Sequence, residues 1–167
     1  MQSVNYSDLY PDNFIHPTAI IYPNVKMGKG NYIGAYCIIG DVPESVKYFD
    51  NTDHGVIIGD NCRLTKQVTI DAGTEKPTII GNNVLMLKNA HVGHDCTIDD
   101  YAELRCNAVA GGHVTIGKFS KLMIGAVIHP RVIVPYGVTI GAMCFVPKNM
   151  ILEPESVYVG VPSKKLK

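Results

Sequence analysis

The chain has 167 residues, which is long enough for one domain with a sizeable core. Its 15 basic and 15 acidic side chains balance, so charge gives no reason to expect nucleic acid or an anionic membrane as a partner. The first residues lack the pattern of a signal peptide, and no run of about 18 apolar residues predicts a membrane-spanning helix.

A six-residue repeat of apolar side chains runs through most of the sequence. It extends from Ile15 to Ile39, from Ile58 to Ile70, and without a break from Ile80 to Leu152. A helix repeats near every 3.6 residues and a simple strand every 2, so neither explains this period. Units of six residues that bury one large and one small side chain are typical of a parallel β-helix. We therefore predict an all-β solenoid of about seven triangular coils, each built from three such units.

Two interruptions of the repeat predict loops that leave the solenoid. They fall near residues 41–56 and 71–79. Extra residues in a solenoid project from its faces, often on the binding face. We assign residues 1–158 to the β-helix with these two excursions, and residues 159–167 to a C-terminal tail or cap.

The cysteines fit the same repeat. Four of the five lie at inward small positions and are predicted to be core residues rather than reactive thiols: Cys37, Cys62, Cys96 and Cys144. Cys106 is out of this phase and is expected to face outward. No CxxC pair is present, which favours reduced thiols in a cytoplasmic protein.

The segment NAHVGHDCTI at residues 89–98 concentrates polar side chains that can carry out chemistry. His91 and His94 are three residues apart, and Asp95 follows directly. Because one coil takes 18 residues, Asp95 and His113 are expected to stack in one column, with His94 and Gly112 in the next. The sequence therefore predicts a polar cluster along one edge of the prism, with space above the glycines for a ligand.

These residue types suit direct acyl transfer. An imidazole can take a proton from a hydroxyl at neutral pH, and an adjacent carboxylate can orient the ring. A backbone N–H such as that of Gly112 can stabilise a developing oxyanion. Direct transfer needs no serine or cysteine nucleophile, and the GxSxG motif is absent from the sequence.

Several segments resemble the hexapeptide-repeat acyltransferases, and most of all the UDP-N-acetylglucosamine O-acyltransferases that act in the synthesis of lipid A, the anchor of lipopolysaccharide. The matching segments are IHPTAI at 15–20, VPESVKYF at 42–49, VTIDAGT at 68–74, NAHVGHDCTI at 89–98 and NAVAGGHVTI at 107–116. The resemblance implies a left-handed parallel β-helix. It also implies a homotrimer with each site between two subunits, and a nucleotide-sugar acceptor.

The resemblance also assigns roles to individual residues. It implies that His94 is the general base, that Asp95 is the acid beside it, and that the amide of Gly112 is the oxyanion donor. The positions it places near the substrate are Lys47, Asp71, His91, His113 and His129. It implies no metal and no permanently bound cofactor, because the co-substrate is a thioester of CoA or of acyl carrier protein.

Departures from the family pattern change the expected substrates. Ser45 stands where the family has an aspartate, and Asp71 and Ala72 replace a His-Arg pair. At least one early coil is missing, and no segment before Lys167 resembles the family's C-terminal helical domain. Instead VGVPSKK resembles the GxPAK ending of small acetyltransferases. We therefore expect an acetyl or another short acyl group.

Two alternatives stay open at this stage. A γ-class carbonic anhydrase shares the fold but needs three histidines on zinc, and Asp99 occupies the position of one of them. A catalytically inactive trimeric scaffold would keep the fold and some polar residues without turnover.

Overall fold

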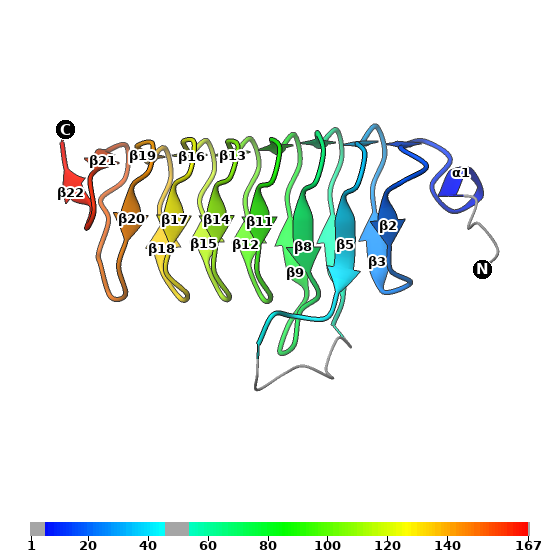
Figure 1. Cartoon of the computed structure of the whole chain (residues 1–167), viewed down its shortest axis with the longest axis horizontal. Helices are drawn as coiled ribbons and strands as arrows, with labels where there is room; N and C mark the ends of the chain where they lie inside the picture. The colour runs from blue at the N-terminus through cyan, green and yellow to red at the C-terminus, as the bar shows by residue number, and fades with distance from the viewer. Residues whose placement is uncertain (1–5, 46–53, 167) are drawn as a thin grey trace.

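The computed structural model describes residues 6–45 and 54–166 as an elongated stack of coils, with the two ends of the chain at opposite ends (Figure 1). A short helix, α1 (Tyr6–Leu9), precedes the first coil. The strands gather into three sheets of nine, seven and six strands, and from β1 to β21 consecutive strands along the chain belong to different sheets. This arrangement confirms the predicted parallel solenoid with three faces.

Sheet A has the strands β1 (Phe14–Ile15), β4 (Tyr32–Ile33), β7 (Arg63–Leu64), β10 (Leu85–Met86), β13 (Glu103–Leu104), β16 (Lys121–Leu122), β19 (Thr139–Ile140), β21 (Val157–Val159) and the antiparallel β22 (Lys164–Lys165). Sheet B has β2 (Ile20–Ile21), β5 (Ile38–Asp41), β8 (Thr69–Asp71), β11 (His91–Val92), β14 (Val109–Ala110), β17 (Val127–Ile128) and β20 (Phe145–Val146). Sheet C has β3 (Val25–Met27), β6 (Val56–Ile58), β9 (Thr78–Ile80), β12 (Thr97–Ile98), β15 (Thr115–Ile116) and β18 (Ile133–Val134).

The core is a column of side chains inside the prism. In the two-residue strands of the coils one side chain points outward and the other inward, as in β13, where Glu103 is half-buried and Leu104 is fully buried. The four inward cysteines are buried and Cys106 is partly exposed, as predicted. One large and one small residue alternate inside each face, and this alternation explains the period of six.

Truncating one of these inward side chains should be costly. Leu104→Ala is expected to lower the free energy of unfolding by about 2–5 kcal/mol, because neighbouring coils leave little freedom for the cavity to collapse. Thermal and urea unfolding measure the change. Ile133→Ala is the control, since Ile133 is 65% exposed and should change stability by less than about 0.5 kcal/mol. Equal losses in both variants would contradict this description of the core.

The corners between strands place several residues in the left-handed backbone region. Within residues 6–45 and 54–166, fourteen non-glycine residues have positive φ, among them Asp95 at 60° and His113 at 61°. Asn, Asp and His tolerate this region better than most residues. Two of the predicted site residues are therefore held at tight corners one coil apart.

The two insertions contact each other. Residues 46–53 of the first insertion lie outside the described residues. In the described part, the amide of Ala72 donates to the carbonyl of Asp41, and Gly55 forms an antiparallel bridge with Gly73. Figure 1 shows that both excursions leave the prism at the same edge. In the described residues, no helix has the length and apolar character needed to cross a membrane.

Candidate active site

His94 and Asp95 form a hydrogen-bonded pair at a corner between β11 and β12. Nδ1 of His94 lies 2.6 Å from Oδ2 of Asp95, and the Asp95 side chain is fully buried. An ionised carboxylate only accepts hydrogen bonds, so Nδ1 carries the proton and donates it. Nε2 of His94 is therefore left with a lone pair, which a general base requires.

The second insertion holds the Asp95 carboxylate in place. Its Oδ1 accepts hydrogen bonds from the backbone N–H groups of Thr74, Glu75 and Lys76, at 2.8–3.0 Å. Its Oδ2 accepts a 2.7 Å bond from the Thr74 hydroxyl as well as the one from His94. In addition, the amide of Asp95 donates to the hydroxyl of Thr78. We call residues 74–76 the Asp95 clamp.

The clamp keeps Asp95 ionised although it is buried. Burial alone would raise the pKa of the Asp95 carboxyl, because it disfavours the charged form. The hydrogen bonds from His94, from the backbone of Glu75 and Lys76 and from the Thr74 hydroxyl outweigh this effect, and the pKa falls below its ordinary value. Asp95 is thus a fixed negative charge beside the His94 ring.

His113 lies one coil above Asp95. Its Nε2 is 3.7 Å from Oδ2 of Asp95, and its ring meets the His94 ring edge-on with centroids 5.1 Å apart. The Arg131 guanidinium lies 3.2 Å from the same Nε2. Burial and the Arg131 charge lower the pKa of His113, so the ring is neutral near pH 7 and accepts the bond from Arg131. The column predicted from the 18-residue spacing is thus observed.

Gly112 packs directly against the His94 ring. A Cβ at position 112 would come within 2.6 Å of Nε2 of His94, so no larger residue fits beside the ring as it stands. The amide of Gly112 donates no hydrogen bond within the parts of the chain that the structure describes. This N–H is therefore available to a ligand placed next to Nε2.

The contact makes Gly112→Ala an informative variant. The added methyl group should displace the His94 ring and lower kcat of the reaction by about 100-fold, because a shift near 1 Å has effects of this size. Stability should change little, since the obstructing atoms are the end of a side chain. Gly141→Ala is the matched control, because its Cβ would also meet a side chain, Val159, at 2.9 Å. Loss of activity in both variants would contradict the specific role of the contact.

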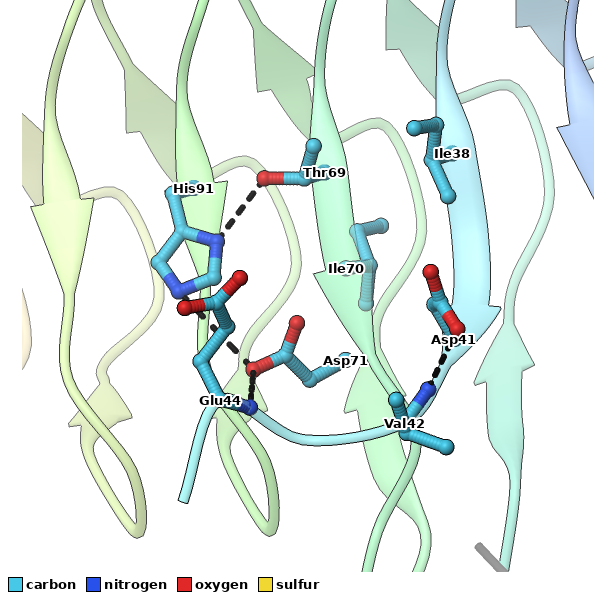
Figure 2. A pocket seen from close by; sticks show the side chains of 8 residues that line it. All are labelled: Ile38, Asp41, Val42, Glu44, Thr69, Ile70, Asp71 and His91. Atoms are coloured by element: carbon cyan, nitrogen blue, oxygen red, sulfur yellow. Dashed lines mark hydrogen bonds and ion pairs between the residues drawn. The ribbon is translucent and has the colours of Figure 1, made fainter. Parts of the chain in front are cut away.

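A pocket of about 370 Å³ lies beside this pair on the outer face of sheet B (Figure 2). His91 hydrogen-bonds through Nδ1 to the Thr69 hydroxyl at 2.8 Å, and its Nε2 lies 3.9 Å from Oδ2 of Asp71. The amide of Glu44 donates a long bond of 3.4 Å to the same oxygen. The pocket is lined by Ile38, Asp41, Val42, Glu44, Thr69, Ile70, Asp71 and His91.

The backbone connects the pocket to the His94–Asp95 pair. In the pairing of β8 with β11, His91 lies opposite Thr69 and Val92 opposite Ile70, which brings Asp71 level with Gly93. Three residues after Asp71 the chain reaches Thr74 of the Asp95 clamp. Pocket and pair are therefore neighbouring parts of one site.

The structure brings together some of the predicted site residues and not others. His94, Asp95, Gly112 and His113 form one cluster, and His91 lies with Asp71. His129 bonds through Nδ1 to the carbonyl of its neighbour Pro130, and no described contact joins it to the cluster. Lys47 lies outside the described residues.

Sequence reasoning missed the Asp95 clamp and Glu44. The insertion itself could have indicated the clamp, because the segment DAGTEKPT lies in the coil directly below Asp95 and follows one of its strands. Spacing could place the loop on this edge, but only the fold of the loop turns three amides and the Thr74 hydroxyl toward one carboxylate.

Buried thiols offer no alternative nucleophile here. Burial raises the pKa of Cys62 to about 11 and that of Cys96 to about 12. Since the thiolate is the reactive form, both are inert near pH 7.

The cluster also has the residue types of a metal site. His94, Asp95 and His113 each offer a ligand atom, and these atoms lie within 4.8 Å of one another. However, both oxygens of Asp95 already accept hydrogen bonds, and Nδ1 of His94 donates one of these bonds. A metal ion would have to displace these bonds.

Comparisons with known proteins identify relatives of the chain. No protein-family model matches the chain. It is 34% identical over 105 residues to an acyl-[acyl-carrier-protein]–UDP-N-acetylglucosamine O-acyltransferase of Campylobacter concisus. This alignment covers 61% of this chain and 40% of the Campylobacter protein. A Sinorhizobium fredii protein of the same name is 31% identical over 135 residues, covering 79% and 50%. The chain is a homologue of these acyltransferases. It spans about half the length of the curated relatives that it matches.

Solved structures of such homologues share the fold. The UDP-N-acetylglucosamine acyltransferase of Bacteroides fragilis superposes with a TM-score of 0.87 at 27% identity, over 92% of this chain and 60% of that one. A GDP-perosamine N-acetyltransferase of Caulobacter crescentus, solved with CoA and GDP-perosamine, gives a TM-score of 0.58 at 22% identity, over 93% and 56%. The match confirms that the solenoid is the left-handed β-helix of the acyltransferase homologues.

Proposed function

We propose that the protein transfers an acyl group from a CoA or acyl-carrier-protein thioester to a hydroxyl or amine of a nucleotide sugar. The observation that carries this proposal is the 2.6 Å bond between Nδ1 of His94 and a clamped, ionised Asp95. It puts the lone pair of the His94 ring on Nε2, next to Gly112, whose amide donates no hydrogen bond to any of the described residues.

In the proposed reaction, Nε2 of His94 takes the proton of the acceptor group as that group attacks the thioester carbonyl. Asp95 stabilises the imidazolium that forms. The Gly112 N–H donates to the oxygen of the tetrahedral intermediate. When the carbon–sulfur bond breaks, the thiolate leaves and takes the proton from His94, which restores the starting state.

The substrates are proposed from the relatives together with the sequence. The curated relatives are named for acyl carrier protein and UDP-N-acetylglucosamine, and the Caulobacter structure for CoA and a GDP-sugar. The VGVPSKK ending favours an acetyl or other short acyl group. We assign substrate contacts to Asp71, His91 and His113, and retain Lys47 and His129 as further candidates.

We also propose a homotrimer in which each site lies between two subunits. Light scattering on the purified protein tests this, because the trimer has three times the 18.2 kDa mass of the chain. The five free cysteines suit the reducing conditions of a cytoplasmic protein.

The activity is tested by measuring thiol release from acetyl-CoA and from acyl carrier protein thioesters, each with a panel of UDP- and GDP-sugars. We expect release that depends on the acceptor, together with an acylated sugar detected by mass spectrometry. Binding of nucleotide sugars without any thiol release would instead favour an inactive scaffold.

A zinc protein related to γ-class carbonic anhydrases is the second candidate, favoured by the His94–Asp95–His113 cluster. Zinc sites of that class use three histidines, whereas this cluster offers two, with a carboxylate that is already fully hydrogen-bonded. Stoichiometric zinc in the purified protein, together with carbon dioxide hydration, would favour this candidate over acyl transfer.

A further inference from the structure

The pocket beside the His94–Asp95 pair is acidic. Three of its eight lining residues are Asp41, Glu44 and Asp71, and His91 is the only basic residue among the eight. A nucleotide diphosphate carries negative charge, so its phosphates would be repelled by these carboxylates at close range. The part of a ligand that enters this pocket should be neutral or positive.

Asp71 is the most buried of the acidic side chains in the pocket. Its side chain is 8% exposed, and its contacts from described residues are the long bond from the Glu44 amide and the 3.9 Å approach of His91. Asp95, in contrast, receives five hydrogen bonds of 3.0 Å or less. Among the residues that the structure describes, Asp71 is therefore a buried carboxylate without a strong partner.

Such a carboxylate is costly unless a ligand completes its contacts. Burial raises the pKa of Asp71, with the nearby His91 acting in the opposite direction. A cationic group in the pocket would compensate the buried charge, whereas a hydroxyl group would supply only one neutral hydrogen bond. Figure 2 shows the Asp71 carboxylate, the Glu44 side chain and the His91 ring directed into the same space.

The pocket is also placed correctly to hold a reacting group. Asp71 is level with Gly93, the residue before His94. A group held by Asp71 would therefore lie close to the proposed base.

We propose that Asp71 is a specificity-determining residue that selects an amino sugar as the acceptor, so that the enzyme acylates nitrogen rather than oxygen. This inference rests on the proposed function, and it adds the class of the acceptor. The acidic pocket receives the amine as its ammonium form and positions it beside His94.

Acyl transfer to nitrogen requires the ammonium group of the acceptor to lose two protons. The ammonium loses one proton to solvent and becomes an amine, whose lone pair forms a carbon–nitrogen bond at the thioester carbonyl. The second proton passes from nitrogen to Nε2 of His94. The carbon–sulfur bond breaks, the thiolate takes this proton, and the products are an amide and a free thiol.

Two matched pairs of acceptors test the proposal. UDP-glucosamine and UDP-glucose differ only in an amine or a hydroxyl at one carbon, and GDP-perosamine and GDP-rhamnose differ likewise at another. Thiol release from acetyl-CoA is measured with all four, using the wild type, Asp71→Asn and Asp99→Asn. Asp99 is the matched control, because burial raises the pKa of this carboxyl too.

We expect at least one amine to be preferred over its hydroxyl counterpart in kcat/KM. We also expect Asp71→Asn to reduce this preference by about 10- to 100-fold, the range that one charged hydrogen bond provides. Asp99→Asn should preserve the preference. A hydroxyl acceptor that is used equally well or better, or a preference unchanged by Asp71→Asn, would overturn the inference and leave acyl transfer intact.

Calorimetric binding of the same four sugars without a thioester separates this inference from the proposed function. If no acceptor is acylated, tighter binding of the amines that is lost in Asp71→Asn would still support the role of Asp71. Equal binding of both members of each pair would overturn it.

Discussion

His94→Ala is expected to lower kcat/KM of acyl transfer by about 10²- to 10⁴-fold, the usual contribution of a general base. The reason is that no other imidazole in the cluster has the same arrangement. His113 accepts a bond from Arg131 at its Nε2, and the Nδ1 of His91 is bonded to Thr69. Acceptor-dependent thiol release measures the loss.

His16→Ala provides the control for this variant. His16 lies at the other end of the prism, where its ring bonds to the hydroxyl of Thr18. It should keep full activity, and both variants should keep the circular dichroism of the wild type. Activity of His94→Ala within a few-fold of the wild type would rule out His94 as the base.

Asp95→Asn is expected to be the most damaging single change in the site, since it affects both folding and activity. An amide NH₂ must take the place of one carboxylate oxygen. If it replaces Oδ1 it faces three N–H donors, and if it replaces Oδ2 it faces the Thr74 hydroxyl and Nδ1 of His94. Stability should fall by about 3–5 kcal/mol, as when one partner is removed from a buried charged network.

The same variant should lower kcat by about 10⁴-fold at temperatures where it stays folded. When the NH₂ group of the substituted side chain lies near Nδ1 of His94, it donates a hydrogen bond to that nitrogen. The ring proton then moves to Nε2, and Nε2 can no longer accept a proton as a base. Thermal unfolding and thiol release measure the two effects, with Asp99→Asn as the control. A variant with lowered stability but unchanged kcat would show that Asp95 serves folding alone.

The clamp predicts a dependence of stability on pH. Because the pKa of Asp95 is lower in the folded state, its contribution to stability is complete above the unfolded value of about 3.9. It is lost as the pH falls from there toward the lower folded value. The difference in unfolding free energy between wild type and Asp95→Asn should therefore be constant above about pH 5 and shrink below about pH 4. A constant difference down to pH 2 would contradict the lowered pKa.

The fold could be predicted because the repeat is a direct record of packing. Every sixth residue enters the core from the next face of the prism, so the apolar spacing fixes the coil. The 18-residue spacing places His113 one coil above Asp95. The inward cysteines followed from the same rule. The hand of the coil came only from the resemblance to the family.

The remaining features depend on loops, where no period applies. Thr74 donates hydrogen bonds to Asp95 only because the second insertion turns its backbone amides toward the prism. The sequence DAGTEKPT does not specify that turn. Asp71 was expected to contact substrate through a family position that normally holds a histidine. Asp71 is buried beneath His91 and Glu44 and lines an acidic pocket. This burial depends on how the described part of the first insertion crosses sheet B.

Asp95 holds the proton of His94 on Nδ1, so that the lone pair of the ring lies on Nε2, the atom proposed to act as the base. Long-range ¹H–¹⁵N NMR of the histidine rings at about pH 8, where a neutral imidazole is expected, tests this most directly. We expect a single Nδ1–H tautomer for His94 in the wild type and its loss in Asp95→Asn. A ring protonated on Nε2, or an even mixture of tautomers in the wild type, would contradict it.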